Sequence, residues 1–267
     1  MRAITRGRHT VRFTRDPEDV IAAQRLRFRA FIAARPGAAL TGDRAEGLDR
    51  DAFDPLCWHA LVTDDRTGDL VCCFRLLRLA GGSEIGRSYS AQYYELSALA
   101  DYPSPMVEMG RFCMAPGIRD PEVIRAAWGA MTTFVEEEGV GLLFGCSSFE
   151  GVDAEAYMDA FAYLKDKHLA PSRWLPRAKA PRIFAFAKAL RLRRPDMKLA
   201  MRRMPPLLRS YLLLGGWVSD HAVIDADLNT LHVFTGVEIN RVPQARRKLM
   251  ERLTGAGRRG GPAGVPG

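Results

Sequence analysis

The fold of this chain is decided by the stretch Met106-Val107-Glu108-Met109-Gly110-Arg111-Phe112-Cys113-Met114. Its valine, methionine, phenylalanine and cysteine residues favour a buried, pleated strand. Alternation along a strand predicts two faces, with Glu108, Gly110 and Phe112 on one and Met109, Arg111 and Cys113 on the other. Gly110 weakens a strand interior and therefore indicates a bulge, or the close approach of another backbone.

A carboxylate and a guanidinium in so apolar a strand are costly to bury alone, so Glu108 and Arg111 each need a partner or a ligand. Two interpretations stay open at this point. The two side chains form a structural ion pair, or Glu108 belongs to a functional site, because desolvation raises a carboxyl pKa and suits it to proton transfer.

The chain has 267 residues, of which 47% are hydrophobic, enough for one large domain with or without an appendage. It contains no apolar run of 18 residues and no signal-peptide pattern, so a cytoplasmic protein is expected. The five cysteines lie in apolar stretches without a CxxC pair, which indicates buried thiols and no metal site.

The net charge of +8 is local rather than spread along the chain. Residues 173–209 hold 12 of the 39 Lys and Arg residues and one of the 31 acids. We therefore expect one domain over 1–254 with a basic insertion or appendage near 173–215. Such a block attracts anionic lipid, nucleic acid or an acidic protein, or forms a solvated face. The Gly- and Pro-rich residues 255–267 are predicted to be disordered.

Periodicity and capping residues give the order of the elements. A strand at 11–13 precedes a helix from Asp16-Pro17 to about Ala34, then a hairpin of strands 56–62 and 70–77. After the strand at 106–114 come a helix from Pro121 to about Glu138, a strand at 141–147, a helix at 153–168 and a late hairpin at 221–235. The order predicts an α/β fold: a mixed sheet that contains a parallel βαβ unit, has helices on both faces and carries Glu108 on its central strand.

This order resembles the N-acetyltransferase (GNAT) superfamily. Charged residues and one aromatic residue at Arg27, Phe31, Asp51, Asp54, Arg75, Glu108 and Arg111 follow an order similar to that of the acyl-homoserine-lactone synthases. A closer resemblance is to the bacterial ornithine-lipid N-acyltransferase family. It rests on Glu108-Met-Gly-Arg-Phe-Cys, Leu143-Phe-Gly-Cys-Ser-Ser-Phe-Glu-Gly, Pro206-Leu-Leu-Arg-Ser-Tyr, Gly216-Trp-Val-Ser-Asp-His-Ala-Val-Ile-Asp and Asp227-Leu-Asn-Thr-Leu-His-Val-Phe-Thr-Gly.

The resemblance implies transfer of a 3-hydroxyacyl group from acyl carrier protein to the α-amine of L-ornithine, giving lyso-ornithine lipid. Glu108 is then the expected base, directly or through water. Asp51 and Asp54 are expected to bind a substrate ammonium, and Arg75 or Arg111 its carboxylate, although either arginine could instead order the acidic loop. The resemblance adds Arg27 and Phe31 to the substrate-binding residues.

On the donor side, backbone N–H groups near Phe112, Cys113 and Met114 are expected to stabilise the thioester oxygen, and Ser147 to contact the pantetheine arm. The stretch Gly117-Ile-Arg-Asp-Pro-Glu lacks the glycine spacing of a coenzyme A pyrophosphate loop and carries acids, which favours a carrier-protein donor and no bound cofactor. Arg119, Arg191, Arg193 and Arg194 are candidates for docking the carrier or the inner face of the membrane.

Other functions stay open. Glutamine or lysine could replace ornithine, and a signal synthase acting on S-adenosylmethionine is a second enzymatic reading. A basic membrane- or nucleic-acid-binding module is the non-enzymatic one, and nucleic acid is disfavoured because aromatic residues do not interleave the basic block. We expect His168, His221 and His232 to be hydrogen-bonded core residues. Ser147 lacks a Gly-x-Ser-x-Gly elbow, so a hydrolase is not expected.

Overall fold

The computed structural model describes residues 3–33 and 46–245; the predicted tail at 255–267 lies outside them. Within these residues ten strands form one mixed sheet in the order β1-β2-β3-β4-β6-β7-β12-β11-β9, with β10 paired to β12. The strands are β1 (Ile4–Arg6), β2 (His9–Thr14), β3 (Trp58–Asp64), β4 (Leu70–Leu79), β6 (Met106–Met114), β7 (Leu142–Glu150), β9 (Ile183–Phe184), β10 (Trp217–Val218), β11 (Ala222–Asp225) and β12 (Thr230–Glu238). A separate small sheet pairs β5 (Tyr94–Glu95) with β8 (Arg177–Ala178).

The central strands β6 and β7 are parallel, whereas the other strand pairs of the large sheet are antiparallel. The pairing between β6 and β7 covers three residues of each strand and ends at Glu108 opposite Phe144. Beyond that point the two strands continue without pairing to each other, so the sheet divides along its middle. The predicted βαβ unit is confirmed, with α2 (Pro121–Glu137) as its crossover.

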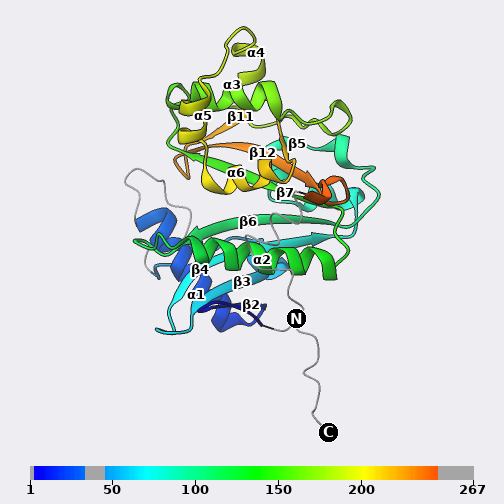
Figure 1. Cartoon of the computed structure of the whole chain (residues 1–267). Helices are drawn as coiled ribbons and strands as arrows, with labels where there is room; N and C mark the ends of the chain where they lie inside the picture. The colour runs from blue at the N-terminus through cyan, green and yellow to red at the C-terminus, as the bar shows by residue number, and fades with distance from the viewer. Residues whose placement is uncertain (1–2, 34–45, 246–267) are drawn as a thin grey trace.

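Helices cover both faces of the sheet, as predicted. They are α1 (Pro17–Arg27), α2, α3 (Met158–Lys167), α4 (Phe186–Ala189), α5 (Met197–Arg203) and α6 (Pro206–Leu213). The helix α1 begins as its sequence predicts, with Asp16 accepting a hydrogen bond from the Glu18 N–H and Pro17 in the first turn. It continues as a π-helical segment, Phe28–Ala33, which carries Phe31. Figure 1 shows α2 along one half of the sheet and α6 along the other.

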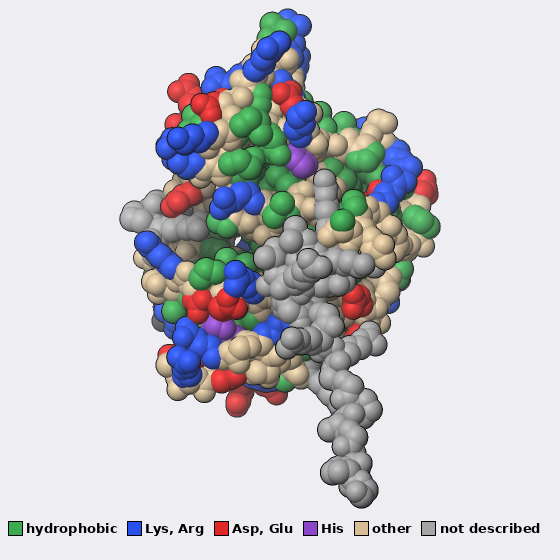
Figure 2. Space-filling model, viewed as in Figure 1, with side chains coloured by type: hydrophobic (Ala, Val, Ile, Leu, Met, Phe, Trp, Pro, Cys, Tyr) green, Lys and Arg blue, Asp and Glu red, His purple; other side chains and the backbone are tan. Residues whose placement is uncertain are grey.

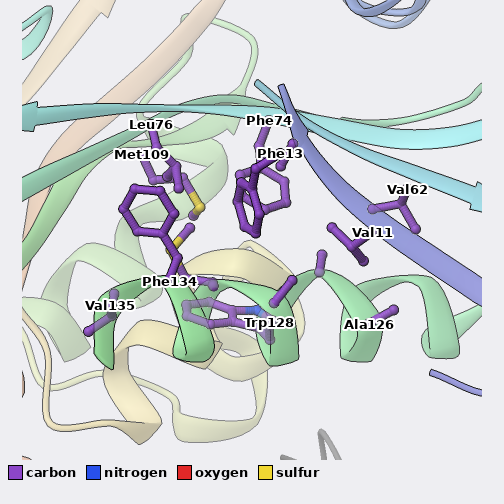
Figure 3. Close-up of a cluster of buried hydrophobic side chains, with 14 of the residues drawn as sticks. Val11, Phe13, Val62, Phe74, Leu76, Met109, Ala126, Trp128, Phe134 and Val135 are labelled. Carbon is purple, nitrogen blue, oxygen red and sulfur yellow. The ribbon is translucent and has the colours of Figure 1, made fainter. Parts of the chain in front are cut away.

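The largest core cluster lies between α2 and strands β2, β3, β4 and β6 (Figure 3). Val123, Met131 and Phe134 of α2 are at most 2% exposed, and the Phe134 ring lies 5.3 Å from that of Phe13. Tyr211 of α6 meets Trp128 of α2 edge to face at 5.3 Å. This contact ties α6 to α2 across the line where the sheet divides.

A bulge in β6 follows Gly110. Arg75 of β4 pairs with Gly110 and Cys73 with Cys113, so Phe74 alone stands opposite both Arg111 and Phe112. Arg111 takes a left-handed backbone conformation, with φ of 53°, which is strained for a residue with a side chain. The bulge near Gly110 is therefore present, but the residue that changes the chain direction is Arg111.

The bulge makes the predicted alternation wrong from Arg111 onward. Phe112 stacks on Phe74 in the cluster that also holds Met109, whereas it was expected on the opposite face. Arg111 turns to the face of Glu108, and both side chains contact Tyr89. One extra residue in a strand moves every following side chain to the opposite face of the sheet, which is why strict alternation fails here.

The basic segment near 173–215 contributes to the body of the protein. Phe186 of α4 and Leu208 of α6 are fully buried beside β12 and α3. Between α4 and α5 the chain projects at the top of the molecule (Figure 1). Among the described residues, no helix combines the length and apolarity needed to cross a membrane.

Candidate active site

A cavity of about 450 Å³ lies where β6 and β7 stop pairing. Its walls come from both faces of the sheet. Glu108, Cys146 and His232 line it on one side, and Ser147, Phe149 and the α5–α6 junction line it on the other. Side chains from both faces of the sheet therefore meet in one cavity that also holds Glu108.

Glu108 is buried, with 4% of its surface exposed. Its carboxylate accepts hydrogen bonds from the backbone N–H groups of Tyr89 and Ser90, both at 2.7 Å, and from the Ser90 hydroxyl at 2.5 Å. Burial raises the pKa of Glu108 above its usual value, although the hydrogen bonds from Ser90 and Tyr89 act in the opposite direction. These bonds hold the carboxylate in place while leaving it suited to exchange a proton with a bound reactant.

The structural pair between Glu108 and Arg111, one of the two interpretations of the strand, does not form. Arg111 instead contacts Asp49 through Nε at 3.1 Å and Asp51 through Nη2 at 3.3 Å. Its guanidinium carbon lies 5.2 Å from the Tyr89 ring centre, a cation–π distance.

Three arginines and three aspartates form one buried network behind the cavity. Arg27 binds both Asp49 and Asp54. Arg75 binds both Asp51 and Asp54, with nitrogen–oxygen distances of 2.6–2.7 Å. Gln24 adds a hydrogen bond to Asp54 at 2.9 Å. The acidic loop that contains Asp49, Asp51 and Asp54 is therefore neutralised by arginines of α1, β4 and β6 and packs against them.

These contacts decide which predicted substrate-binding residues face the cavity. Phe31, Arg75 and Arg111 line it, whereas Arg27, Asp51 and Asp54 lie behind them in the network. The Arg27 and Arg75 guanidiniums hold the pKa of Asp54 well below its usual range, despite burial, so this carboxylate stays charged. The substrate-binding role assigned to these six residues remains a prediction, and the network gives Arg27, Asp51 and Asp54 a role in positioning.

The predicted donor-side residues also separate into two groups. Phe112 and Ser147 line the cavity, and the Ser147 hydroxyl accepts a hydrogen bond from Thr235 at 2.9 Å. Cys113 and Met114 lie outside the lining; the Cys113 sulfur is 3.6 Å from that of Cys73, beneath α1. Burial raises the pKa of the Cys146 thiol to about 12, so this cavity residue is a neutral thiol.

Gly145 allows the backbone of β6 to approach β7 closely just beyond their last paired residues. A Cβ atom on this residue would lie 2.3 Å from the carbonyl oxygen of Met109, so no side chain fits there. The backbone of β6 thus points toward β7 at Met109, immediately beyond the last paired residues.

The candidate docking arginines lie outside the cavity lining. Arg119, Arg191, Arg193 and Arg194 are exposed, and Arg193 forms an ion pair with Asp159 at 3.0 Å. Two basic residues that sequence reasoning did not single out, Arg202 and Arg203, line the cavity at the end of α5. Nothing in a basic run distinguishes these two, because only the packing of α5 brings them to the opening.

Sequence reasoning also missed Tyr89, Ser90, Asp225 and His232. Tyr89 and Ser90 precede and begin a short 3-10 turn without a hydrophobic period, so no pattern marked them. Asp225 and His232 lie within the late segments that carry the family resemblance, which was a signal that could have been followed. The histidines are hydrogen-bonded as expected, and His232 in addition lines the cavity.

The fold is that of the GNAT acetyltransferases. Residues 26–129 match the acetyltransferase (GNAT) domain family. A CoA-dependent acyl-homoserine lactone synthase, BjaI, solved with SAM and isopentyl-CoA, shares the fold with a TM-score of 0.50 and 14% sequence identity; the match covers 91% of this chain and 85% of that one.

The sequence comparison narrows this class. An L-ornithine N(alpha)-acyltransferase of Rhodobacter capsulatus is 32% identical over 250 residues, which cover 91% of this chain and 95% of the relative. The enzyme of the same name from Brucella abortus is 30% identical, covering 88% of this chain and 86% of the relative. The chain therefore belongs to the L-ornithine N(alpha)-acyltransferase family.

Proposed function

We propose that this acyltransferase moves a 3-hydroxyacyl group from acyl carrier protein to the α-amine of L-ornithine, giving lyso-ornithine lipid, the first intermediate of ornithine lipid synthesis. The relatives named above support the acceptor. The observation that carries the chemistry is Glu108, a buried carboxylate of raised pKa on the wall of a cavity that joins both faces of the sheet.

The reaction forms a nitrogen–carbon bond and breaks the carbon–sulfur bond of the thioester. An ammonium is not a nucleophile, so the α-amine must lose a proton before it attacks and a second proton as the amide forms. Glu108 accepts a proton directly or through water, and the departing pantetheine thiolate takes one up. Backbone N–H groups of the bulged stretch, which begins at Arg111, are the proposed donors to the developing oxyanion.

The ornithine carboxylate is proposed to bind Arg111. Both arginines of the cavity wall contact Asp51, Arg75 at 2.6–2.7 Å and Arg111 at 3.3 Å. The second contact of Arg111, to Asp49, is 3.1 Å long. Arg111 is therefore the less tightly engaged guanidinium and has more capacity for a second carboxylate. Phe31 would pack against the acceptor from the end of the first helix.

The N-terminus of α2 supports a carrier-protein donor over coenzyme A. Asp120 caps this helix and pairs with Arg8 at 2.8 Å, and Glu122 of the first turn pairs with Arg125. Carboxylates of the protein already occupy the helix end that would otherwise attract a pyrophosphate. A phosphopantetheine arm brings one phosphate, which we assign to Arg202 and Arg203 at the opening of the cavity.

A membrane contact is proposed for the projecting segment after α4. Leu192 is 83% exposed and lies between Arg191, Arg193 and Arg194. Figure 2 shows basic and hydrophobic side chains together at this upper tip. An apolar side chain surrounded by arginines suits the surface of an anionic leaflet, where the lipid product must be delivered.

The function is tested by measuring thiol release from 3-hydroxyacyl carrier protein, with ornithine, lysine, glutamine or S-adenosylmethionine as the acceptor and 3-hydroxyacyl coenzyme A as the alternative donor. We expect release with carrier protein and ornithine, and formation of an amide at the α-amine. Preference for glutamine or lysine would change the acceptor, and turnover of S-adenosylmethionine would indicate a signal synthase. Absence of release with every acceptor would refute the proposal.

A further inference from the structure

We propose that Asp225 and the Nε2 atom of His232 form a subsite for the side-chain ammonium of the acceptor amino acid. This inference rests on the proposed function and deepens it, because it names the residues that would select a cationic amino acid over a neutral one. Neither residue belongs to the arginine–aspartate network behind the cavity.

Asp225 is a buried carboxylate that forms no direct ion pair within the described part of the chain. It is 6% exposed, ends strand β11 and lines the cavity. Its Oδ1 accepts a hydrogen bond from the Leu228 N–H at 3.0 Å, but no ion pair to it exists among the described residues. Burial is the largest effect on this carboxyl and raises its pKa above the usual value, and the charge of Arg111 and the hydrogen bonds from the Leu228 and Asp227 N–H groups act in the opposite direction without cancelling it.

His232 offers a hydrogen-bond acceptor in the same cavity. The Tyr94 hydroxyl donates its proton to the His232 carbonyl oxygen at 2.8 Å. The oxygen of the Tyr94 hydroxyl therefore accepts a hydrogen bond from the Nδ1 atom of His232, 3.1 Å away. Nδ1 then carries the proton and Nε2 carries a lone pair. His232 is only 3% exposed, and its buried Nε2 atom has no hydrogen-bond partner among residues 3–33 and 46–245. Burial lowers the pKa of His232 to about 4, so the ring is neutral near pH 7.

Asp225 and His232 lie close together, on the same side of the cavity as Glu108. Strands β11 and β12 lie side by side (Figure 1). Val223 pairs with His232 and Asp225 with Thr230, so Asp225 and His232 are diagonal neighbours on one face of the two strands, about 7–8 Å apart. A single ammonium between them could reach both. Cys146, whose sulfur lies 3.4 Å from the Ser90 hydroxyl that binds Glu108, sits on the next strand, β7, and lines the same cavity.

The chemistry of the pair fits an alkylammonium. A carboxylate and a neutral imidazole nitrogen both accept hydrogen bonds from N–H donors, and the carboxylate supplies the opposite charge. Asp51 and Asp54 are less suited to this task, because each already binds two arginines. An acceptor of the same length that lacks the terminal amine would leave both Asp225 and His232 unpaired.

The test compares ornithine with norvaline, which has the same carbon chain without the terminal amine. For the wild-type enzyme and Asp225→Asn, kcat/KM is measured for each amino acid with 3-hydroxyacyl carrier protein. We expect the ornithine-to-norvaline ratio to fall by about tenfold or more in Asp225→Asn, mainly through KM for ornithine, while norvaline turnover changes little. His232→Phe should lower the same ratio to a smaller extent.

Asp69→Asn is the control, because Asp69 is an exposed carboxylate before β4 and lies outside the cavity lining. An unchanged ratio in folded Asp225→Asn would overturn the subsite. Calorimetric measurement of ornithine and norvaline binding distinguishes failure of the subsite from failure of the proposed function. If the wild-type protein acylates no amino acid, tighter binding of ornithine than norvaline that is lost in Asp225→Asn still supports the subsite, and equal binding of both amino acids overturns it.

Discussion

At the residue scale, Glu108 is governed by two opposing effects. Removal from water favours its neutral form, whereas three hydrogen-bond donors from Tyr89 and Ser90 favour the carboxylate. The pKa is raised, so desolvation is the larger effect. The strand sequence predicted a buried carboxylate of this kind, but it could not supply the donors, because they come from an irregular segment 18 and 19 residues earlier in the chain.

The base role of Glu108 predicts a pH dependence. In the wild-type enzyme, kcat/KM should fall as the pH drops through the pKa of Glu108, at a pH above the usual carboxyl range, because the protonated acid cannot accept a proton. Glu108→Gln should lower kcat by about 10²–10⁴-fold and remove this acidic limb. Steady-state rates from pH 4 to 9, with circular dichroism to verify folding, provide the measurement. Unchanged turnover in the folded variant would leave Glu108 with a structural role alone.

At the element scale, the arginine–aspartate network joins four parts of the chain. Asp49, Asp51 and Asp54 come from the loop before β3, and their partners come from α1, β4 and β6. Each carboxylate and guanidinium is recognisable in the sequence, which also allows the arginines to order the acidic loop. The pairing itself was not predictable, because the partners lie 21 to 62 residues apart.

Removing Asp54 should destabilise the protein more than removing a surface aspartate. Asp54→Ala leaves Arg27 and Arg75 buried with part of their charge unpaired, which should lower the free energy of unfolding by about 3–5 kcal/mol at pH 7. Asp69→Ala, an exposed control, should change it by less than about 0.5 kcal/mol. Urea unfolding followed by circular dichroism measures both variants, and equal losses would contradict the structural role of the network.

The same carboxylate gives the stability a defined pH dependence. Because folding lowers the pKa of Asp54, its contribution is present above the usual aspartate pKa and is lost as the pH falls through the folded-state value. The difference in unfolding free energy between the wild-type protein and Asp54→Ala should therefore be largest near neutral pH and shrink in acid. A difference that grows on acidification would contradict this assignment.

At the scale of the whole molecule, two basic surfaces have separate positions. Arg202 and Arg203 border the cavity, whereas Arg191, Arg193 and Arg194 flank the exposed Leu192 on the projecting segment. In the sequence these residues form one basic block. Only the fold divides the block into a surface next to the reaction and a surface at the edge of the molecule.

This separation predicts two independent defects. Replacing Arg191, Arg193 and Arg194 with Gln should weaken sedimentation with anionic vesicles by about fivefold for each charge, while turnover of soluble carrier protein stays unchanged. Replacing Arg202 and Arg203 with Gln should raise KM for the carrier protein with little change in vesicle binding. If the first variant alters KM and not sedimentation, the projecting segment docks the carrier protein instead.

The sequence by itself determined the longer helices and strands, their order, and the membership of a charged central strand in a mixed sheet, because alternation, helix caps and turn residues act over a few neighbouring positions. The tertiary structure alone decided how Arg111 turns at the bulge, which arginine meets which aspartate, and where the cavity opens. These features depend on strand register and on contacts between distant segments. The parallel pairing of β6 and β7 ends after three residues, and no local pattern encodes that end point.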